Sequence, residues 1–397
     1  MTATRLLRRA LLGSALTLAG ACSIHRGDWR TARAEDPAPG LSPAPRLLLV
    51  GGLGAGAASR AVSDALLRRL DQAPVDGEPT IVIWLGDQID PKTCELPADP
   101  ASAQLLARVA QHRARGGASF AVRGLAEWTC AAPLTPPGAP WSAPSANYVV
   151  RVGRGGAAAV ASRCAGAPLR CELSPDPGDS LAELVVLDTT PWLDREAAGD
   201  GPAAAASLAE QRALLAALLA APGPERILVT HHPIESAGPH GQGGIWPDSA
   251  LLFHEEALAR AIVGGAFVGA VSGHERSLQA VADASPAVKR SSRAWLRAPF
   301  FQVIAGAVSR PDAGRGPRTW RFFQGTALAP DHISNHAGYA ELTLRASAYE
   351  LTLRARRYGR WREAALYVDR GRPPHPAETA SPVMDPCADC DPIATRW

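Results

Sequence analysis

The stretch ILVTHHPIESAGPHG, residues 227–241, decides which fold the chain is expected to adopt. Its first three residues are a short apolar run after a polar break, which is typical of a buried strand. His231 and His232 follow at the point where that strand would end. In α/β sheets, ligands bind just beyond the carboxyl ends of strands, so two imidazoles at this place are candidates for metal or phosphate chemistry. Taken alone, the pair also fits two loop histidines without a chemical role.

The segments around this stretch alternate between strand-like and helix-like patterns. Apolar runs at 47–50 and 81–85 end at glycines, and each is followed by helical spacing, at 58–70 and 101–115. This order favours a largely parallel core. Further strands are predicted at 119–122, 147–152, 157–161, 184–187, 267–271, 300–304, 320–323, 340–344 and 350–353, and further helices at 208–219 and 250–262.

The first 22 residues have the features of an export signal. Basic residues precede an apolar run at 10–18, and Leu18 to Cys22 resembles a bacterial lipobox, in which the cysteine is acylated after cleavage. We therefore expect a lipoprotein that is anchored through Cys22 in the bacterial cell envelope, with soluble secretion as the alternative. Residues 23–45 and 370–397 are rich in proline, alanine and charge, and are predicted to be a disordered linker and a disordered tail.

Charge and missing motifs exclude several classes of function. The 397-residue chain has a formal net charge of +3, and its arginines are dispersed, which argues against a nucleic-acid partner. The glycine run at 51–56 lacks the GK[ST] ending of a nucleotide P-loop. A serine hydrolase is disfavoured because the sequence has no GxSxG elbow. The lipid anchor is the only membrane contact expected, and the oligomeric state stays open.

Five strand ends carry motifs in a fixed order: VGGLG (50–54), GDQID (86–90), VRGLAEW (122–128), THHPIESAGPHG (230–241) and SGHERSLQ (272–279). In this order they resemble the motifs of the calcineurin-like metallophosphoesterases, particularly the purple acid phosphatase branch: GDxG, GDxxD or GDxxY, GNHD or GNHE, HHPxxSxGxHG and GHxHxLQ. The resemblance implies one four-layer α/β/β/α domain at 46–369. In it, two mixed sheets face each other, helices lie outside, and a two-metal phosphoester hydrolase site lies at the strand ends.

The resemblance also assigns roles to single residues. Asp87 matches the carboxylate that bridges two metals, and His231 and His274 match ligands of one and the same metal. His240 matches a histidine that can donate a proton, and an incidental loop histidine is the equally weighted alternative. Four positions lack the ligand or acid that the family pattern has there. Gly52 stands in place of an aspartate, Leu125 in place of the ligand asparagine, Ala126 in place of the histidine that supports the leaving group, and Arg276 in place of the last histidine.

These departures leave a site for at most one metal. Two imidazoles and one carboxylate with open positions suit a single iron, zinc or manganese ion, and a site without any metal is the other outcome. Arg276, a permanent cation, can replace the lost metal beside Asp87 and attract a phosphoester or another anion, or it can be an ordinary surface arginine. Glu127 is expected to be a solvated loop residue, and the alternative is an acid that supports the metal ligands from behind. The predicted function is weak or narrowed phosphoester hydrolysis, and the alternative is a pseudoenzyme that binds an anionic ligand or a partner protein.

Six cysteines besides Cys22 form an even set, which would pair in an oxidising envelope. Cys94 and Cys130 are expected to pair, because they lie seven and six residues beyond Asp87 and Gly124, at the ends of neighbouring strands. The other predicted pairs are Cys164 with Cys171, which closes a short loop, and Cys387 with Cys390 in the tail. The CADC of that last pair also fits a redox or zinc half-site, but no second CxxC is present to complete four ligands.

Overall fold

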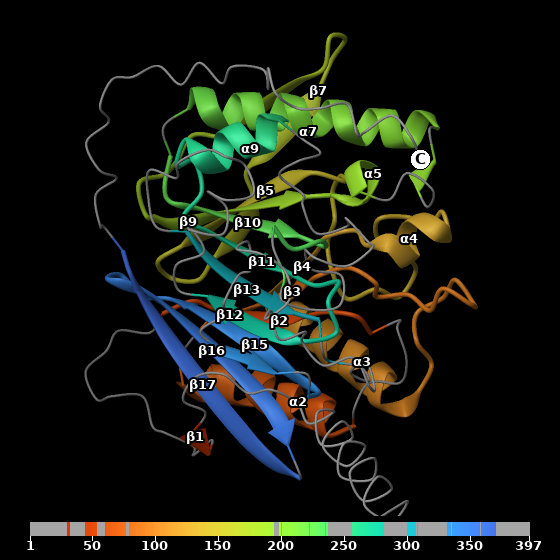
Figure 1. The fold of residues 1–397 in the computed structure, drawn as a ribbon, viewed down its shortest axis with the longest axis vertical. Helices are drawn as coiled ribbons and strands as arrows, with labels where there is room; N and C mark the ends of the chain where they lie inside the picture. Colours follow the sequence, from red (N-terminus) through yellow and green to blue (C-terminus); the bar gives the residue numbers. More distant parts are fainter. Residues whose placement is uncertain are drawn as a thin grey trace, which may run out of the picture.

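The structure is a computed structural model, and two mixed sheets form its centre (Figure 1). It describes residues 30–31, 44–53, 60–76, 79–193, 198–199, 201–221, 223–234, 236, 256–281, 300–306, 308, 332–334, 336–357 and 359–370.

The first sheet has seven strands in the order β1-β17-β16-β15-β2-β3-β4. Strands β2, β3 and β4 are parallel, and β15 pairs antiparallel with β2, so that Ala340 lies opposite Leu49. Helices α2 and α3 cover the outer face of this sheet, at the bottom of Figure 1. The bounds are β1 Arg30–Thr31, β2 Arg46–Val50, α2 Arg60–Asp76, β3 Thr80–Trp84, α3 Pro100–Ala114, β4 Ala118–Ala121, β15 Gly338–Leu344, β16 Ala348–Arg357 and β17 Arg360–Asp369.

The second sheet has eight strands in the order β14-β12-β13-β11-β10-β9-β5-β6. Its centre, β9, β10, β11 and β13, is parallel. Helices α7 and α9 cover its outer face, at the top of Figure 1. The bounds are β5 Tyr148–Gly153, β6 Ala158–Val160, β9 Ser180–Leu187, α5 Thr190–Leu193, α7 Pro202–Ala220, β10 Arg226–Thr230, α9 Glu256–Val263, β11 Gly269–Ser272, β12 Leu278–Val281, β13 Phe301–Ala305 and β14 His332–Ser334.

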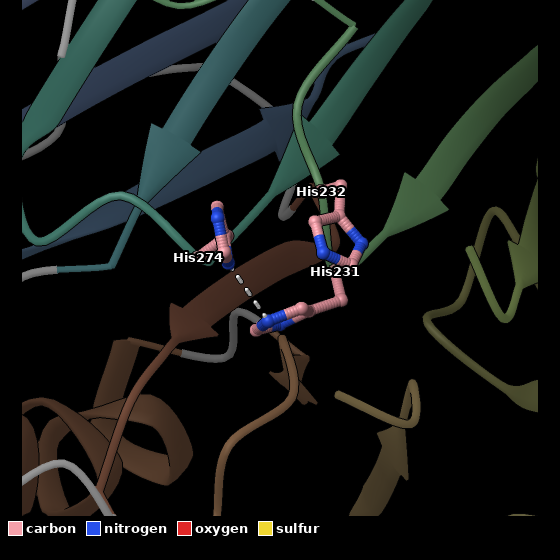
Figure 2. A group of neighbouring side chains, drawn as sticks. All are labelled: His231, His232 and His274. Carbon is pink, nitrogen blue, oxygen red and sulfur yellow. Dashed lines mark hydrogen bonds between the residues drawn. The ribbon is translucent and has the colours of Figure 1, made fainter. Parts of the chain in front are cut away.

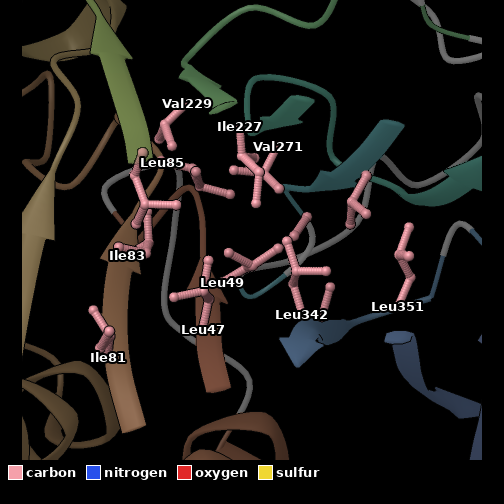
Figure 3. Packing of buried hydrophobic residues seen from close by; sticks show 14 of the residues in the cluster. Leu47, Leu49, Ile81, Ile83, Leu85, Ile227, Val229, Val271, Leu342 and Leu351 are labelled. Atoms are coloured by element: carbon pink, nitrogen blue, oxygen red, sulfur yellow. The ribbon is translucent and has the colours of Figure 1, made fainter. Parts of the chain in front are cut away.

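The main core lies between the two sheets. Leu47 and Ile83 of the first sheet share one buried cluster with Ile227 and Val271 of the second sheet (Figure 3). Alternate residues such as Leu48 point the other way and pack under the helices. Strands that are buried on both faces read as continuous apolar runs, which explains why the sequence revealed them. The predicted α/β/β/α sandwich of two mixed sheets is therefore confirmed.

Several details differ from the sequence predictions. The stretch 23–45, predicted to be disordered, contains β1, which pairs with β17. Arg370, the first residue of the predicted tail, forms an ion pair with Glu225. The loop at 164–171 is an antiparallel hairpin of β7 (Ser162–Ala165) and β8 (Arg170–Leu173). Strand β17 was not predicted at all. The signal segment 1–22 with Cys22, the segment 320–323 and the tail pair Cys387 and Cys390 lie outside the described residues.

The described residues contain two disulfides, and both match the predicted pairing. Cys94–Cys130 joins the loop after β3 to the end of the short helix α4 (Leu125–Thr129), and Cys164–Cys171 joins β7 to β8. Disulfides of this kind are typical of oxidising compartments. Within the described ranges, α7 is the one helix whose length and composition would allow it to cross a membrane, and it packs Leu214 and Leu218 against the sheet.

Candidate functional site

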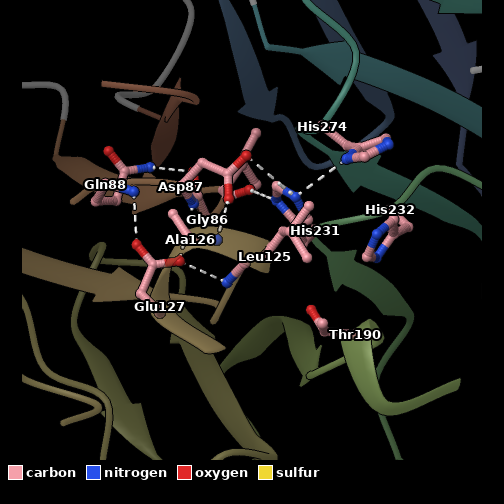
Figure 4. A network of polar contacts seen from close by, with 12 residues as sticks. Gly86, Asp87, Gln88, Leu125, Ala126, Glu127, Thr190, His231, His232 and His274 are labelled. Carbon is pink, nitrogen blue, oxygen red and sulfur yellow. Dashed lines mark hydrogen bonds and ion pairs between the residues drawn. The ribbon is translucent and has the colours of Figure 1, made fainter. Parts of the chain in front are cut away.

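Three strand ends bring the predicted metal ligands together. Asp87 follows β3 of the first sheet, whereas His231 and His274 follow the parallel neighbours β10 and β11 of the second sheet. The site therefore bridges the carboxyl edges of both sheets. His231 Nε2 lies 3.2 Å from His274 Nδ1 and 3.5 Å from Asp87 Oδ2 (Figure 4).

Glycines permit this close approach of the strand ends. A Cβ atom on Gly86, whose φ is +84°, would collide with the His231 ring and with the backbone of Gly124. A Cβ atom on Gly273 would lie only 2.5 Å from the carbonyl oxygen of Leu85. Because only glycine lacks this atom, the two sheets can meet at the site without displacing the imidazole.

Two of the predicted ligands have an unusual backbone conformation. Asp87 and His274 have φ angles of 57° and 59°, in the left-handed region that few residues other than glycine adopt. Such conformations cost free energy and cluster at functional sites, where the surrounding contacts maintain them. At Asp87 one such contact is the backbone N–H of Ala126, which donates to Oδ1 at 2.9 Å and leaves Oδ2 facing His231.

The His231 ring is held in one orientation. Its Nδ1 lies 2.8 Å from the carbonyl oxygen of Leu85, which can only accept, so Nδ1–H is the donor. The lone pair of Nε2 therefore faces Asp87 and His274. A histidine whose second nitrogen donates to a backbone carbonyl is the usual arrangement of a metal ligand. The side chain is fully buried, so its orientation is fixed by packing as well.

A third imidazole belongs to the same cluster. The ring nitrogens of His231, His232 and His274 that could bind a metal all lie within 4.8 Å of one another (Figure 2). His232 is buried, and its Nδ1 forms a hydrogen bond of 2.8 Å with the Thr189 hydroxyl. The pair of histidines after the strand is a candidate for metal chemistry from the sequence, but the motif resemblance assigns a ligand role to His231 alone.

Glu127 is buried, and the prediction that it is solvated is wrong. Its side chain is 6% exposed and lies beneath the turn that carries Asp87 (Figure 4). The carboxylate accepts four backbone N–H groups: Asp87 at 3.0 Å, Gln88 at 2.6 Å, Ile89 at 3.3 Å and Gly124 at 2.8 Å. Burial, followed by the charge of Asp87, raises the pKa of this carboxyl, and the N–H donors oppose that shift. Glu127 thus fixes the loop of the predicted bridging ligand.

A second buried carboxyl group supports α4 from behind. Trp128 Nε1 donates to both carboxylate oxygens of Asp188, at 3.0 and 2.8 Å, and the Thr190 N–H donates to one of them. Burial raises the pKa of Asp188 to about 7, against the opposing effect of Arg123. The Arg123 guanidinium also lies 4.0 Å from the centre of the Trp128 ring. These contacts connect the end of β9 to the helix that lies beside Asp87.

The positions that depart from the family pattern supply no further ligand. Gly52, two residues beyond the end of β2, has a φ of 67°, and Leu125 begins α4 with an apolar side chain. Arg276 is exposed, and its predicted pairing with Asp87 stays a prediction. His240 lies outside the described residues. The structure thus assembles Asp87, His231 and His274, and it adds His232 and Glu127.

Comparisons with known proteins give similarity at the level of overall structure. No protein-family model matches the chain, and no curated protein sequence matches it. Similar solved structures include GAP50, the anchor in the inner membrane complex of Plasmodium, with 14% identity and a TM-score of 0.48 over 80% of this chain and 86% of that one. The purple acid phosphatase PPD1 from yellow lupin seeds has 12% identity and a TM-score of 0.48 over 84% of this chain and 55% of that one. PhoD has 11% identity and a TM-score of 0.43 over 84% and 70%. Overlaps at this level carry no functional argument.

Proposed function

We propose that the protein is a metallophosphoesterase-type hydrolase whose centre holds a single metal ion between His231, His274 and Asp87. The observation that carries this proposal is the 3.2 Å separation of His231 Nε2 and His274 Nδ1. Two nitrogens that bind one tetrahedral zinc ion, each at about 2.0–2.1 Å, lie about 3.3 Å apart. The two imidazoles are thus spaced as ligands of one ion, with Asp87 Oδ2 at 3.5 Å from His231 Nε2.

The donor set fits one metal and not two. Two imidazoles and a carboxylate suit iron, zinc or manganese, and the Leu85 carbonyl fixes the required tautomer of His231. A second ion would need ligands where Gly52 and Leu125 stand, and neither side chain can donate. A bound metal supplies Lewis acidity: it polarises a phosphoryl oxygen and lowers the pKa of coordinated water.

The residues around the centre support slow or narrowed hydrolysis. Glu127 accepts the backbone N–H of Asp87, and the Ala126 N–H donates to the Asp87 carboxylate, so both keep this residue in place. His231, which faces that carboxylate, is buried. Ala126 stands where the resemblance expects a histidine that supports the leaving group, so that contribution is missing. The lipobox-like segment and the two disulfides support an exported protein that is anchored through Cys22.

A second candidate function is a pseudoenzyme that binds an anionic ligand or a partner protein through the same edge of the sheets. Its support is the chemistry of three positions: Gly52, Leu125 and Ala126 offer neither a ligand nor an acid. The exposed cation Arg276, two residues beyond His274, would then attract the anion.

Metal content separates these functions. Elemental analysis of purified wild-type protein should find one metal ion per chain, and His231→Ala and His274→Ala should lose it. His336→Ala, a change outside the centre, is the matched control and should keep the metal. Slow, metal-dependent hydrolysis of an aryl phosphate would support the hydrolase, whereas metal without turnover would favour the pseudoenzyme. Two ions per chain, or metal retained in His231→Ala, would contradict the proposed centre.

A further inference from the structure

A groove lies at the opposite end of β3 from the metal centre. Its volume is about 820 Å³, which is within the range of ligand-binding pockets. It is lined by Thr80 at the start of β3, by Ala118 at the start of β4, and by the hairpin between β5 and β6. Because β4 and β6 are the last strands of their sheets, the groove runs between two sheet edges.

The charged side chains among the described lining residues are all positive. Arg113 and Arg115, at the end of α3, line the groove, and none of the described lining residues is Asp or Glu. An Arg113 NH2 group donates to the Ser142 hydroxyl at 2.8 Å, which orients this guanidinium along the wall. His112 also lines the groove, but burial lowers its pKa, and its Nε2 donates to the Thr80 carbonyl, so it adds no cation. The groove therefore favours carboxylates.

The edge of β6 offers backbone groups that its own sheet does not use. The Ala161 carbonyl accepts the Ser174 N–H, so the edge is already used at this residue. One hydrogen bond joins each of two pairs of the β5–β6 ladder, from Gly153 N–H to the Ala157 carbonyl and from Ala161 N–H to the Val149 carbonyl. Such pairs alternate with non-bonded ones in an antiparallel ladder, so Ala158 and Val160 are the non-bonded positions. Their N–H and C=O groups consequently point away from β5, toward the open edge.

Apart from its length of only three residues, this edge lacks the features that usually protect an edge strand. The sequence of β6 is Ala-Ala-Val, without charge or proline, and Val160 is a large apolar side chain that is 40% exposed. The hairpin beside it begins with glycines, and a Cβ atom on Gly155 would meet nothing within 4 Å. A Cβ atom on Gly156, in contrast, would overlap with the Pro79 side chain, so the hairpin backbone can be approached at Gly155 and not at Gly156.

We propose that this groove binds an extended acidic segment of a partner protein, which adds to β6 as a further strand and places carboxylates against Arg113 and Arg115. The backbone row of β6, which no strand of the described residues pairs on its outer side, favours a peptide over a small anion, because strand addition uses main-chain hydrogen bonds for affinity. The arginines disfavour a second copy of this chain, since a symmetric pairing would oppose two basic grooves. The interaction is independent of the metal centre.

The test uses the full disulfide-bonded chain and two fluorescent nine-residue peptides, one alternating valine with glutamate and one alternating valine with lysine. The glutamate peptide should bind about tenfold tighter or more, equivalent to about 1.4 kcal/mol, and added salt should weaken its binding. Arg113→Glu with Arg115→Glu should reverse this preference. Both arginines are exposed, so these changes should leave the fold intact.

The edge itself is tested at Val160. Val160→Pro removes the outward N–H without removing a hydrogen bond to β5, so it should weaken binding of the glutamate peptide about tenfold. The control Val160→Thr keeps that N–H and should bind the peptide like the parent. Equal binding of both peptides, no binding at millimolar concentration, or an unchanged preference in the double arginine variant would overturn the proposal. Citrate that competes at the same concentration as the peptide would assign the groove to a small anion. Self-association that Val160→Pro abolishes would assign it to a second copy, and both results contradict the proposal.

Discussion

Replacing Glu127 with glutamine tests how the Asp87 loop is held. The carboxylate accepts four backbone N–H groups, two on each oxygen: Gln88 and Ile89 on Oε1, and Asp87 and Gly124 on Oε2. A glutamine of the same shape keeps one oxygen and presents an NH2 group to the other two donors. Those two N–H groups then lose their acceptor in a site that is 6% exposed.

The expected cost follows from this count. A buried donor that loses its partner costs about 1–3 kcal/mol, so two such donors should reduce the free energy of unfolding by about 2–6 kcal/mol. This is a large part of the 5–15 kcal/mol that is typical of a folded domain. Metal affinity should fall as well, because the loop that presents Asp87 would no longer be fixed.

Urea denaturation at neutral pH measures the first effect, and a zinc titration measures the second. The urea midpoint of Glu127→Gln should fall while the m-value stays unchanged. Glu95→Gln, an exposed change in the same loop, is the control and should stay within about 0.5 kcal/mol of the parent. If the denaturation curve and the zinc affinity of Glu127→Gln both overlay those of the parent, Glu127 does not fix the loop.

Three further predictions concern the surroundings of the centre. The pKa of Asp188 is raised to about 7, so between about pH 4 and pH 7 the folded state keeps a proton that the unfolded state releases. The free energy of unfolding of the wild type should therefore fall by up to about 4 kcal/mol as the pH rises through this range, and denaturation of Asp188→Asn at several pH values should show a flatter slope. Replacing Cys94 and Cys130 with alanine should cost about 3–4 kcal/mol by loop entropy and weaken zinc binding, whereas removal of the other described disulfide should leave zinc affinity unchanged in the same titration. If Arg276 pairs with Asp87, Arg276→Ala should lower the melting temperature at neutral pH and abolish phosphate binding by calorimetry; overlapping melting curves with unchanged phosphate affinity would identify an ordinary surface arginine.

The sequence alone predicted the strands in which every residue is buried. Strands β2, β3 and β10 are buried on both faces, so their apolar runs were visible without knowledge of their neighbours. Strand β17 was missed because its sequence, RWREAALYVD, mixes charged and apolar residues and has no continuous apolar run that would mark a buried strand. Its identity as a strand depends on pairing with β16, which is a tertiary contact.

The same distinction applies to the site. Asp87, His231 and His274 were found because their motifs resemble those of the calcineurin-like metallophosphoesterases, and each motif lies just beyond the end of a strand. Glu127 was misjudged because its partners at 87–89 lie about 40 residues earlier in the chain, and spacing within its own loop does not reveal them. His232 received no ligand role because the motif match covers only His231, whereas the turn after β10 places both rings in one cluster.

The pairing of β2 with β15 places the two ends of the domain beside each other in the middle of one sheet. Leu49 meets Ala340 across this ladder, so the sheet that carries Asp87 is completed only by the last strands of the chain. A nascent chain that lacks 338–369 would expose both the unpaired edge of β2 and the apolar face of the sandwich. Contacts of such sequence separation slow folding, because a long loop must close before they form. The domain should therefore stay unfolded until residues 338–369 have been synthesised.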